Sequence, residues 1–201
     1  MYRFLRFGAL IVSCLLCVAS AHGIEVRVTA PALERTLRRQ LFNQAGPDGK
    51  LDRVYIKGGL ARGCYVYADD PHVSFKDDRV VVTVKTHAKL GVGKACFGIS
   101  LSTESMVSFI PEAEGESVGF RDARIDHLSD NKELDLLLEP FLSKKLPQEM
   151  KVNAAELMRT LLVKAPDSTG YTLTLSSLKL HSMLVTGDVL VVDLDAAIKV
   201  E

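Results

Sequence analysis

The chain has 201 residues, of which 47% are hydrophobic and 25% are charged, a composition typical of a globular domain. Lysine and arginine (25 together) balance aspartate and glutamate (25), so the chain lacks the basic excess of a general nucleic-acid-binding protein. Aromatic residues make up only 6% and tryptophan is absent, which disfavours a site that stacks on bases or sugars.

The N-terminus has the three parts of an export signal. Arg3 and Arg6 form a basic start, residues 8–18 are an almost unbroken apolar run, and Ala19-Ser20-Ala21 supplies the small residues that signal peptidase recognises. The run is shorter than the roughly 20 residues that span a bilayer. We therefore expect cleavage after Ala21, which removes residues 1–21.

Such processing leaves residues 22–201 as a single domain in the periplasm or outside the cell, and this is the location that we expect. Two alternatives are an uncleaved N-terminal anchor and a lipoprotein, because Ile11-Val12-Ser13-Cys14 is similar to a lipobox. Cleavage before Cys14 would place apolar residues directly after the lipid, which is unusual, so the soluble product is favoured.

A short strand and an amphipathic helix begin the mature chain. Residues 24–28 alternate between apolar and charged side chains, and residues 31–43 are expected to be helical, with Pro31 in the first turn. The turn signal at residues 46–49, Gly-Pro-Asp-Gly, ends the helix. Leucines recur every four residues along it and form one apolar stripe, Leu33, Leu37 and Leu41.

From residue 51 to about residue 128 the hydrophobic pattern has the period of a strand. In residues 79–87 three valines point one way and side chains such as Lys85 and His87 point the other; the valines are Val80, Val82 and Val84. Further strands are expected at residues 54–56, 65–67, 97–101, 106–110 and 118–125. Short turns join them at residues 77–78, 91–93 and 112–116, so we expect an antiparallel meander.

Two helical segments and closing strands follow the meander. Asp130 is the candidate N-cap of a long helix, and Pro140 lies inside that helix, so we expect a kink there. Its apolar stripe is formed by Leu134, Leu137, Leu138, Phe141 and Leu142. Pro147 interrupts the pattern, and a second helix begins at Asn153 and ends before Pro166. The tail returns to strands at residues 171–175, 178–184 and 189–200.

The sequence has no glycine-rich phosphate loop and no His-Glu-x-x-His motif. We therefore expect no enzymatic activity, no cofactor and no bound metal. Three polar groups could take part in catalysis or cation binding, or could simply be exposed to solvent. For each of them we favour simple exposure to solvent. They are Asp69-Asp70 (cation site or turn), His87 (catalytic or solvent-facing) and the pair Asp193 and Asp195, which share a strand face (acid–base pair or wet outer face).

The apolar side chains are more informative. They form either an ordinary core or the wall of an elongated apolar cavity between helices and sheet, which would accept an acyl chain, a sterol or a similar lipid. The leucine-rich stripes at residues 33–41, 134–146 and 157–162 are broad enough for either. The expected lining of such a cavity is Leu37, Leu41, Leu134, Leu137, Leu138, Phe141 and Leu142, with Val80, Val82 and Val84 opposite.

The order of elements also resembles bacterial relatives of the tubular lipid-binding (TULIP) superfamily, in particular the small YceB-type envelope proteins. The matching features are the early helix at residues 31–43, the long meander, the segment Leu136-Leu137-Leu138-Glu139-Pro140-Phe141-Leu142 and the closing strands at residues 171–200. In that superfamily a strongly curved antiparallel sheet wraps a long helix, and the groove between them holds a lipid-like molecule. The resemblance therefore implies an α+β fold of this kind.

For function, the resemblance implies that the protein binds or transports a lipid or another hydrophobic small molecule. We expect a monomer that does not bind nucleic acid and that contacts the membrane or other envelope proteins only transiently. The alternative is an envelope interaction or assembly protein with a filled core and no small-molecule ligand. A hydrolase of lipid or cell-wall substrates is a more distant third.

Removal of residues 1–21 leaves two cysteines, Cys64 and Cys96, each in strand-like sequence. A metal site is disfavoured, since the CxxC spacing and nearby histidine pair of a zinc site are missing. We predict a Cys64–Cys96 disulfide, which would close a loop of about 30 residues and add about 3–4 kcal/mol to the free energy of unfolding. Thiol titration of the denatured, unreduced protein should find no free thiol, and two reactive thiols per chain would contradict the pairing.

Overall fold

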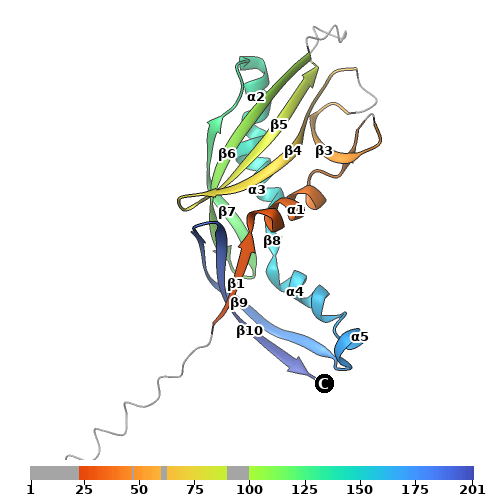
Figure 1. The fold of residues 1–201 in the computed structure, drawn as a ribbon, viewed down its shortest axis with the longest axis vertical. Coiled ribbons are helices and arrows are strands. Elements are labelled where there is room, and N and C mark those ends of the chain that lie inside the picture. The colour runs from red at the N-terminus through yellow and green to blue at the C-terminus, as the bar shows by residue number, and fades with distance from the viewer. Residues whose placement is uncertain (1–22, 47, 60–62, 90–99) are drawn as a thin grey trace, which may run out of the picture.

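Two antiparallel sheets form most of the structure, a computed structural model that describes residues 23–46, 48–59, 63–89 and 100–201. The larger sheet occupies the upper part of an elongated molecule and the smaller sheet the lower part (Figure 1). The described strands pair antiparallel throughout. Together with the helices they confirm the predicted α+β class.

The larger sheet has the strand order β2-β3-β4-β5-β6-β7-β8 and the smaller sheet the order β1-β10-β9. The bounds are Ile24–Thr29 (β1), Gln44–Ala45 (β2), Leu51–Lys57 (β3), Tyr65–Lys76 (β4), Arg79–Lys89 (β5), Ser100–Glu114 (β6), Ser117–His127 (β7), Val152–Asn153 (β8), Leu173–Thr186 (β9) and Val189–Val200 (β10). The strands predicted at residues 24–28, 54–56, 65–67, 79–87, 106–110, 118–125 and 189–200 all lie within these bounds and are confirmed.

Two pairs of predicted strands are each a single strand. The gap expected between residues 101 and 106 is wrong, because β6 pairs with β5 through this polar stretch. Residues 173–175 of one predicted strand and the whole of the next, 178–184, both belong to β9, where a register shift opposite Ala197 and Ile198 disturbs the alternation without ending the strand. Residues 97–99 of one predicted strand and the turn predicted at residues 91–93 lie outside the described residues.

Helices cover one face of each sheet. Their bounds are Ala30–Gln40 (α1), Lys132–Pro140 (α2), Phe141–Lys145 (η2, a π-helical turn), Leu146–Glu149 (α3), Ala154–Leu162 (α4) and Pro166–Thr169 (α5). Helices α2 and α3 lie behind the strands of the larger sheet, and α4 lies beside β9 in the lower part (Figure 1). No described helix combines the length and the hydrophobicity needed to cross a membrane.

The helical turns continue from α2 through η2 to α3 without a break. The π-helical turn begins directly after Pro140, whose missing N–H removes one helical hydrogen bond. The prediction that Pro147 interrupts the helix is wrong. Pro147 lies in the first turn of α3, where no intrahelical N–H is required. The kink at Pro140 and the strong curvature of the sheet stay predictions.

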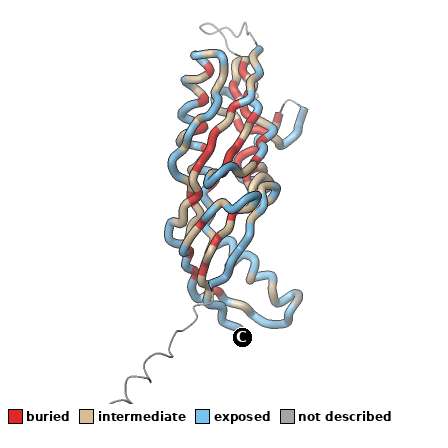
Figure 2. Tube along the Cα trace, turned by 60° about the vertical axis from the view of Figure 1, so that its left-hand side comes forward, coloured by how far each residue is buried: buried red, intermediate tan, exposed pale blue. Residues whose placement is uncertain are grey.

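Buried apolar side chains form two clusters. The upper core lies between the larger sheet and the helices α1, α2, η2 and α3, and the lower core lies between the smaller sheet and α4. Val80, Val82 and Val84 are buried in the upper core, which confirms the predicted face of β5. Figure 2 shows that buried segments extend from the upper strands into the lower part of the molecule.

The N-cap of α2 is Asn131 rather than the predicted Asp130. The Asn131 side-chain oxygen accepts hydrogen bonds from the backbone N–H groups of Glu133 and Leu134, both at 3.0 Å. The next helix, α4, is capped by Asn153 as predicted, since its side chain accepts from the N–H of Glu156 at 2.9 Å. Because Asn131 and not Asp130 accepts these hydrogen bonds, α2 begins one residue later than predicted.

Replacing Asn131 with alanine should lower the free energy of unfolding by about 1 kcal/mol, because two N–H groups lose their acceptor. The matched change Asp130→Ala removes no cap and should shift it by less than about 0.5 kcal/mol. Urea denaturation of the two variants measures both values. Equal losses in the two variants would contradict the assignment of the cap.

Candidate functional site

The predicted lining residues come together in the upper core. Nine of the ten are buried members of this cluster, and Leu137 is partly buried and packs against it. Helix α1 supplies Leu37, its C-cap supplies Leu41, and the remainder come from α2, η2 and β5. A filled core and a wall around an apolar molecule both bury such side chains, so their role as a lining stays a prediction.

A second apolar feature, missed by the sequence analysis, lies at the lower end of the molecule, where α4, α5 and the ends of β9 and β10 meet (Figure 1). The side chains here are between 44% and 78% exposed. We call the exposed apolar residues of these elements and their connections the apolar tip; they are Leu157, Leu161, Val163, Tyr171, Ile198 and Val200. Its existence depends on how α4 and β10 are oriented, which no local pattern reveals.

Helix α4 contributes to the tip because it is apolar on two sides. Ala155, Met158 and Leu162 belong to or pack against the lower core. Leu157 and Leu161, which the sequence predicts to share one stripe with Met158 and Leu162, are instead more than half exposed. The apolar stripe expected over residues 157–162 is therefore divided between a packed side and an open side.

Strand β10 contributes the other part of the tip. Ile198 lies opposite Leu175 of β9, and Val200 lies opposite Leu173, so these four side chains share one face of the sheet. Leu175 on that face is buried in the lower core, whereas Ile198 and Val200 are exposed. The apolar face of the smaller sheet thus continues beyond the part that α4 covers.

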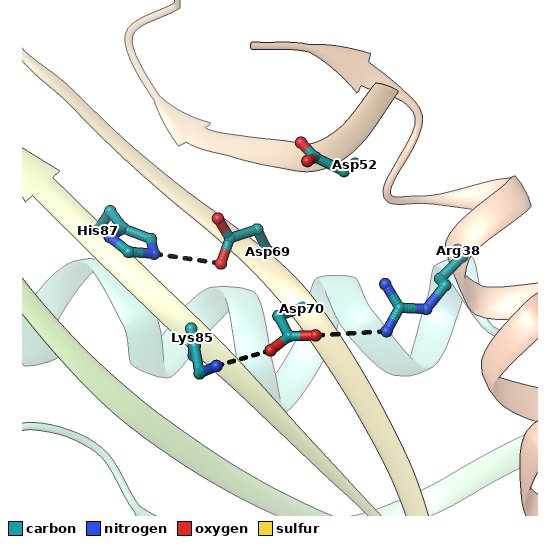
Figure 3. Close-up of a pocket in the computed structure, with 6 residues that line it drawn as sticks. All are labelled: Arg38, Asp52, Asp69, Asp70, Lys85 and His87. Atoms are coloured by element: carbon teal, nitrogen blue, oxygen red, sulfur yellow. Dashed lines mark hydrogen bonds and ion pairs between the residues drawn. The ribbon is translucent and has the colours of Figure 1, made fainter. Parts of the chain in front are cut away.

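An open polar cleft of about 330 Å³ lies on the opposite, outer face of β4 and β5 (Figure 3). It is built from four elements that only the tertiary fold brings together, and this is why the sequence analysis did not find it. Its lining residues are Arg38 from α1, Asp52 from β3, Asp69 and Asp70 from β4, and Lys85 and His87 from β5. Lys85 and His87 point outward, as the alternation of β5 predicts.

The cleft lies over an irregularity in β4. The register against β5 shifts between Asp69 and His72, and Asp70 has a φ of 46°, in the left-handed region. The turn predicted at Asp69-Asp70 is therefore wrong, since both residues belong to a strand that bulges at Asp70. The Arg38 guanidinium donates to the Pro71 carbonyl at 2.9 Å and so fixes α1 against the bulge.

Asp70 is the centre of an ion-pair network (Figure 3). Its carboxylate accepts from Lys85 Nζ at 2.7 Å and from Arg38 Nη2 at 3.5 Å. The hydrogen bond from Lys85 lowers the pKa of Asp70 below its usual value, and Asp70 in turn raises the pKa of Lys85. Both groups are more than half exposed, so solvent screens much of this attraction.

His87 is held between two partners. Its Nε2 lies 3.2 Å from Asp69 Oδ1, and its ring stacks on Tyr67 with the centroids 4.9 Å apart. The Arg53 guanidinium lies 4.8 Å from the centroid of the same Tyr67 ring. The residues lining the cleft include no Ser, Cys or Thr, so the His87–Asp69 pair has no hydroxyl or thiol nucleophile among them to activate.

The remaining polar candidates have local partners. Asp193 and Asp195 alternate with buried Leu194 and share one face as predicted, and Asp195 Oδ2 lies 2.7 Å from His181 Nε2. Across the described part of the chain no group of three or more His, Cys, Asp or Glu is placed to hold a metal ion. The hypothesis of a cation site at Asp69-Asp70 therefore has no ligand set there.

The predicted disulfide involves one described residue. Cys64 lies just before β4 and is disulfide-bonded. Cys96 lies outside the described residues, so the Cys64–Cys96 pairing stays a prediction.

Comparisons of the chain with known protein families, curated proteins and solved structures find no match. The function is therefore inferred from the side chains themselves.

Asp70→Asn tests the network while keeping the backbone, because asparagine also accepts the left-handed conformation. The lowered pKa of Asp70 means that its stabilisation is present above the usual aspartate pKa and is lost as the pH falls through the lowered value. Wild type should therefore be more stable than this variant at about pH 7, and the difference should be smaller at about pH 3, below the usual aspartate pKa.

Asp77→Asn is the matched control for this experiment. Asp77 also has a left-handed φ, of 55°, but forms no ion pair with any described residue. Urea denaturation at the two pH values should show no pH-dependent difference for this control. A stability difference for Asp70→Asn that is the same at both pH values would contradict the assigned role of the ion pair.

Proposed function

We propose that the protein is an exported, non-enzymatic protein of the cell envelope that binds an apolar, lipid-like molecule. The molecule lies between the helices and the larger sheet, against the predicted lining, and enters from the apolar tip. The predicted export signal supports a location in the envelope, and the resemblance to TULIP proteins supports the same class of ligand.

The observation that carries this proposal is the continuity of the apolar interior. Leu33, Phe75 and Val185 pack against both the upper and the lower core. Apolar side chains therefore continue from the predicted lining, through these three residues, to the lower core and the tip beyond it. A long apolar molecule would meet apolar contacts along this whole path.

The exposed tip supports the same proposal on energetic grounds. Each Å² of apolar surface left in water forgoes about 25 cal/mol of burial free energy. Exposed apolar side chains that gather at one end of a molecule are typical of a binding surface. An acyl chain gains about 0.8 kcal/mol for each CH₂ group that it buries, so a chain of ordinary length binds without a charged anchor.

A second candidate is the envelope interaction or assembly protein with a filled core. It is favoured by the burial of nine of the ten predicted lining residues within one packed cluster. In this case the apolar tip would be covered by a partner protein instead of admitting a ligand. The two candidates differ in whether the upper core has room for a ligand.

Leu138→Trp separates the two candidates. Leu138 is fully buried in α2, whereas Leu136 on the same helix is 73% exposed, so Leu136→Trp is the matched control. If the interior holds a lipid-like molecule, the indole takes its place and the Leu138→Trp protein stays folded but empty. Organic extraction and mass spectrometry of protein purified from the periplasm should find lipid in wild type and in the control only.

A filled core predicts a different result for Leu138→Trp. The larger side chain would then overpack the cluster and lower the free energy of unfolding by about 1–3 kcal/mol or more. Destabilisation of Leu138→Trp, together with wild-type protein that yields no extractable lipid, would contradict lipid binding and favour the interaction protein.

A further inference from the structure

One polar atom in the upper part of the molecule is buried without a partner. The hydroxyl oxygen of Thr86 is inaccessible to solvent and forms no hydrogen bond with the described residues. An unsatisfied hydroxyl of this kind costs about 1–3 kcal/mol. Buried polar groups are nearly always hydrogen-bonded, so this exception requires an explanation.

Thr86 lies on the face of β5 that the predicted lining uses. It follows Val80, Val82 and Val84 at the same two-residue spacing, so its side chain points to the same side of the sheet. Valine has nearly the same volume as threonine and has no hydroxyl to satisfy. A valine at position 86 would therefore fill the same space in the core without leaving a polar atom unsatisfied.

The neighbours of Thr86 are small and uncharged. Ala68 of β4 and Thr103 of β6 lie directly opposite it, and Ala88 follows on the same face of β5. Ala68 and Ala88 are both buried members of the upper core. The hydroxyl is therefore surrounded on this face by small side chains that carry no charge.

The other hydroxyl groups on this face are occupied. The Ser105 hydroxyl donates to the Leu128 carbonyl at 2.9 Å, and the Thr103 hydroxyl donates to the Glu104 carbonyl at 3.4 Å. Neither is therefore oriented toward Thr86. Among these three hydroxyls Thr86 alone is left to bond with something other than the protein.

We propose that Thr86 is the polar anchor of the bound lipid-like molecule, a step that rests on the function proposed above. Its hydroxyl bonds to a neutral oxygen of the ligand, the hydroxyl of a long-chain alcohol or sterol or the carbonyl of an ester. A carboxylate or phosphate does not fit, because burying a charge among alanine, valine and threonine carries a large desolvation cost. The site selects neutral lipids with one oxygen-bearing end.

Oleyl alcohol and octadecene are the probes, because they have the same chain length and differ mainly in the hydroxyl. Each is delivered from cyclodextrin, and its affinity is measured by displacement of the apolar fluorophore N-phenyl-1-naphthylamine. Wild type should bind the alcohol about tenfold more tightly than the hydrocarbon, the gain of one buried hydrogen bond. Oleate at about pH 9 should bind more weakly than the alcohol.

Thr86→Val should abolish the preference for the alcohol and leave the affinity for octadecene unchanged. Thr86→Ser keeps a hydroxyl and should retain most of the preference. Thr103→Val is the matched control, since its hydroxyl already has a partner, and it should behave as wild type. Circular dichroism checks that each variant is folded, and Thr86→Ala replaces Thr86→Val if the latter is not.

The outcomes distinguish this proposal from the one on which it rests. Binding of neither probe to wild type overturns both proposals. Binding of both probes with equal affinity, or a preference for the alcohol that persists in Thr86→Val, overturns the role of Thr86 and leaves lipid binding intact. Loss of the preference in Thr86→Val alone supports the anchor.

Discussion

The alternation of side chains along β5 is the constraint on which both candidate sites depend. Val82, Val84 and Thr86 face the helices, while Lys85 and His87 between and beyond them face outward. A shift of this strand by one residue would place the charged side chains in the core and the valines in water. The burial of the valine face therefore fixes the position of the polar cleft on the other side. The apolar interior and the cleft are two consequences of the same register.

Helix α1 connects these two faces by completing the edge of β4. Strand β3 pairs with β4 only as far as Asp69. Beyond that residue the Glu34 carboxylate accepts from the Val73 N–H at 3.3 Å, and Arg38 donates to the Pro71 carbonyl. Polar side chains of a helix thus satisfy backbone groups that a neighbouring strand would otherwise satisfy. The same helix buries Leu37 in the upper core, so one element serves both sides of the sheet.

Sequence periodicity predicted most strands, because alternation and turn signals such as Asp77-Asp78 are local properties. It placed the cap of α2 one residue early, since only hydrogen-bond geometry separates Asp130 from Asn131. The polar cleft was beyond its reach, because Arg38 and Asp70 are 32 residues apart and meet only through the tertiary fold. Thr86 was missed for a related reason. It alternates along β5 like any strand residue, and only the three-dimensional positions of its neighbours show that its hydroxyl has no partner.

The packing of Leu33, Phe75 and Val185 against both clusters has a consequence for how the molecule unfolds. Two cores that share few residues can open as separate cooperative units, each with its own free energy of opening. A flexible chain lying across the junction would contact both units and would be lost when either one opens. Ligand binding would then raise the opening free energy of each half and couple their fluctuations. The occupied protein would then behave as one cooperative body.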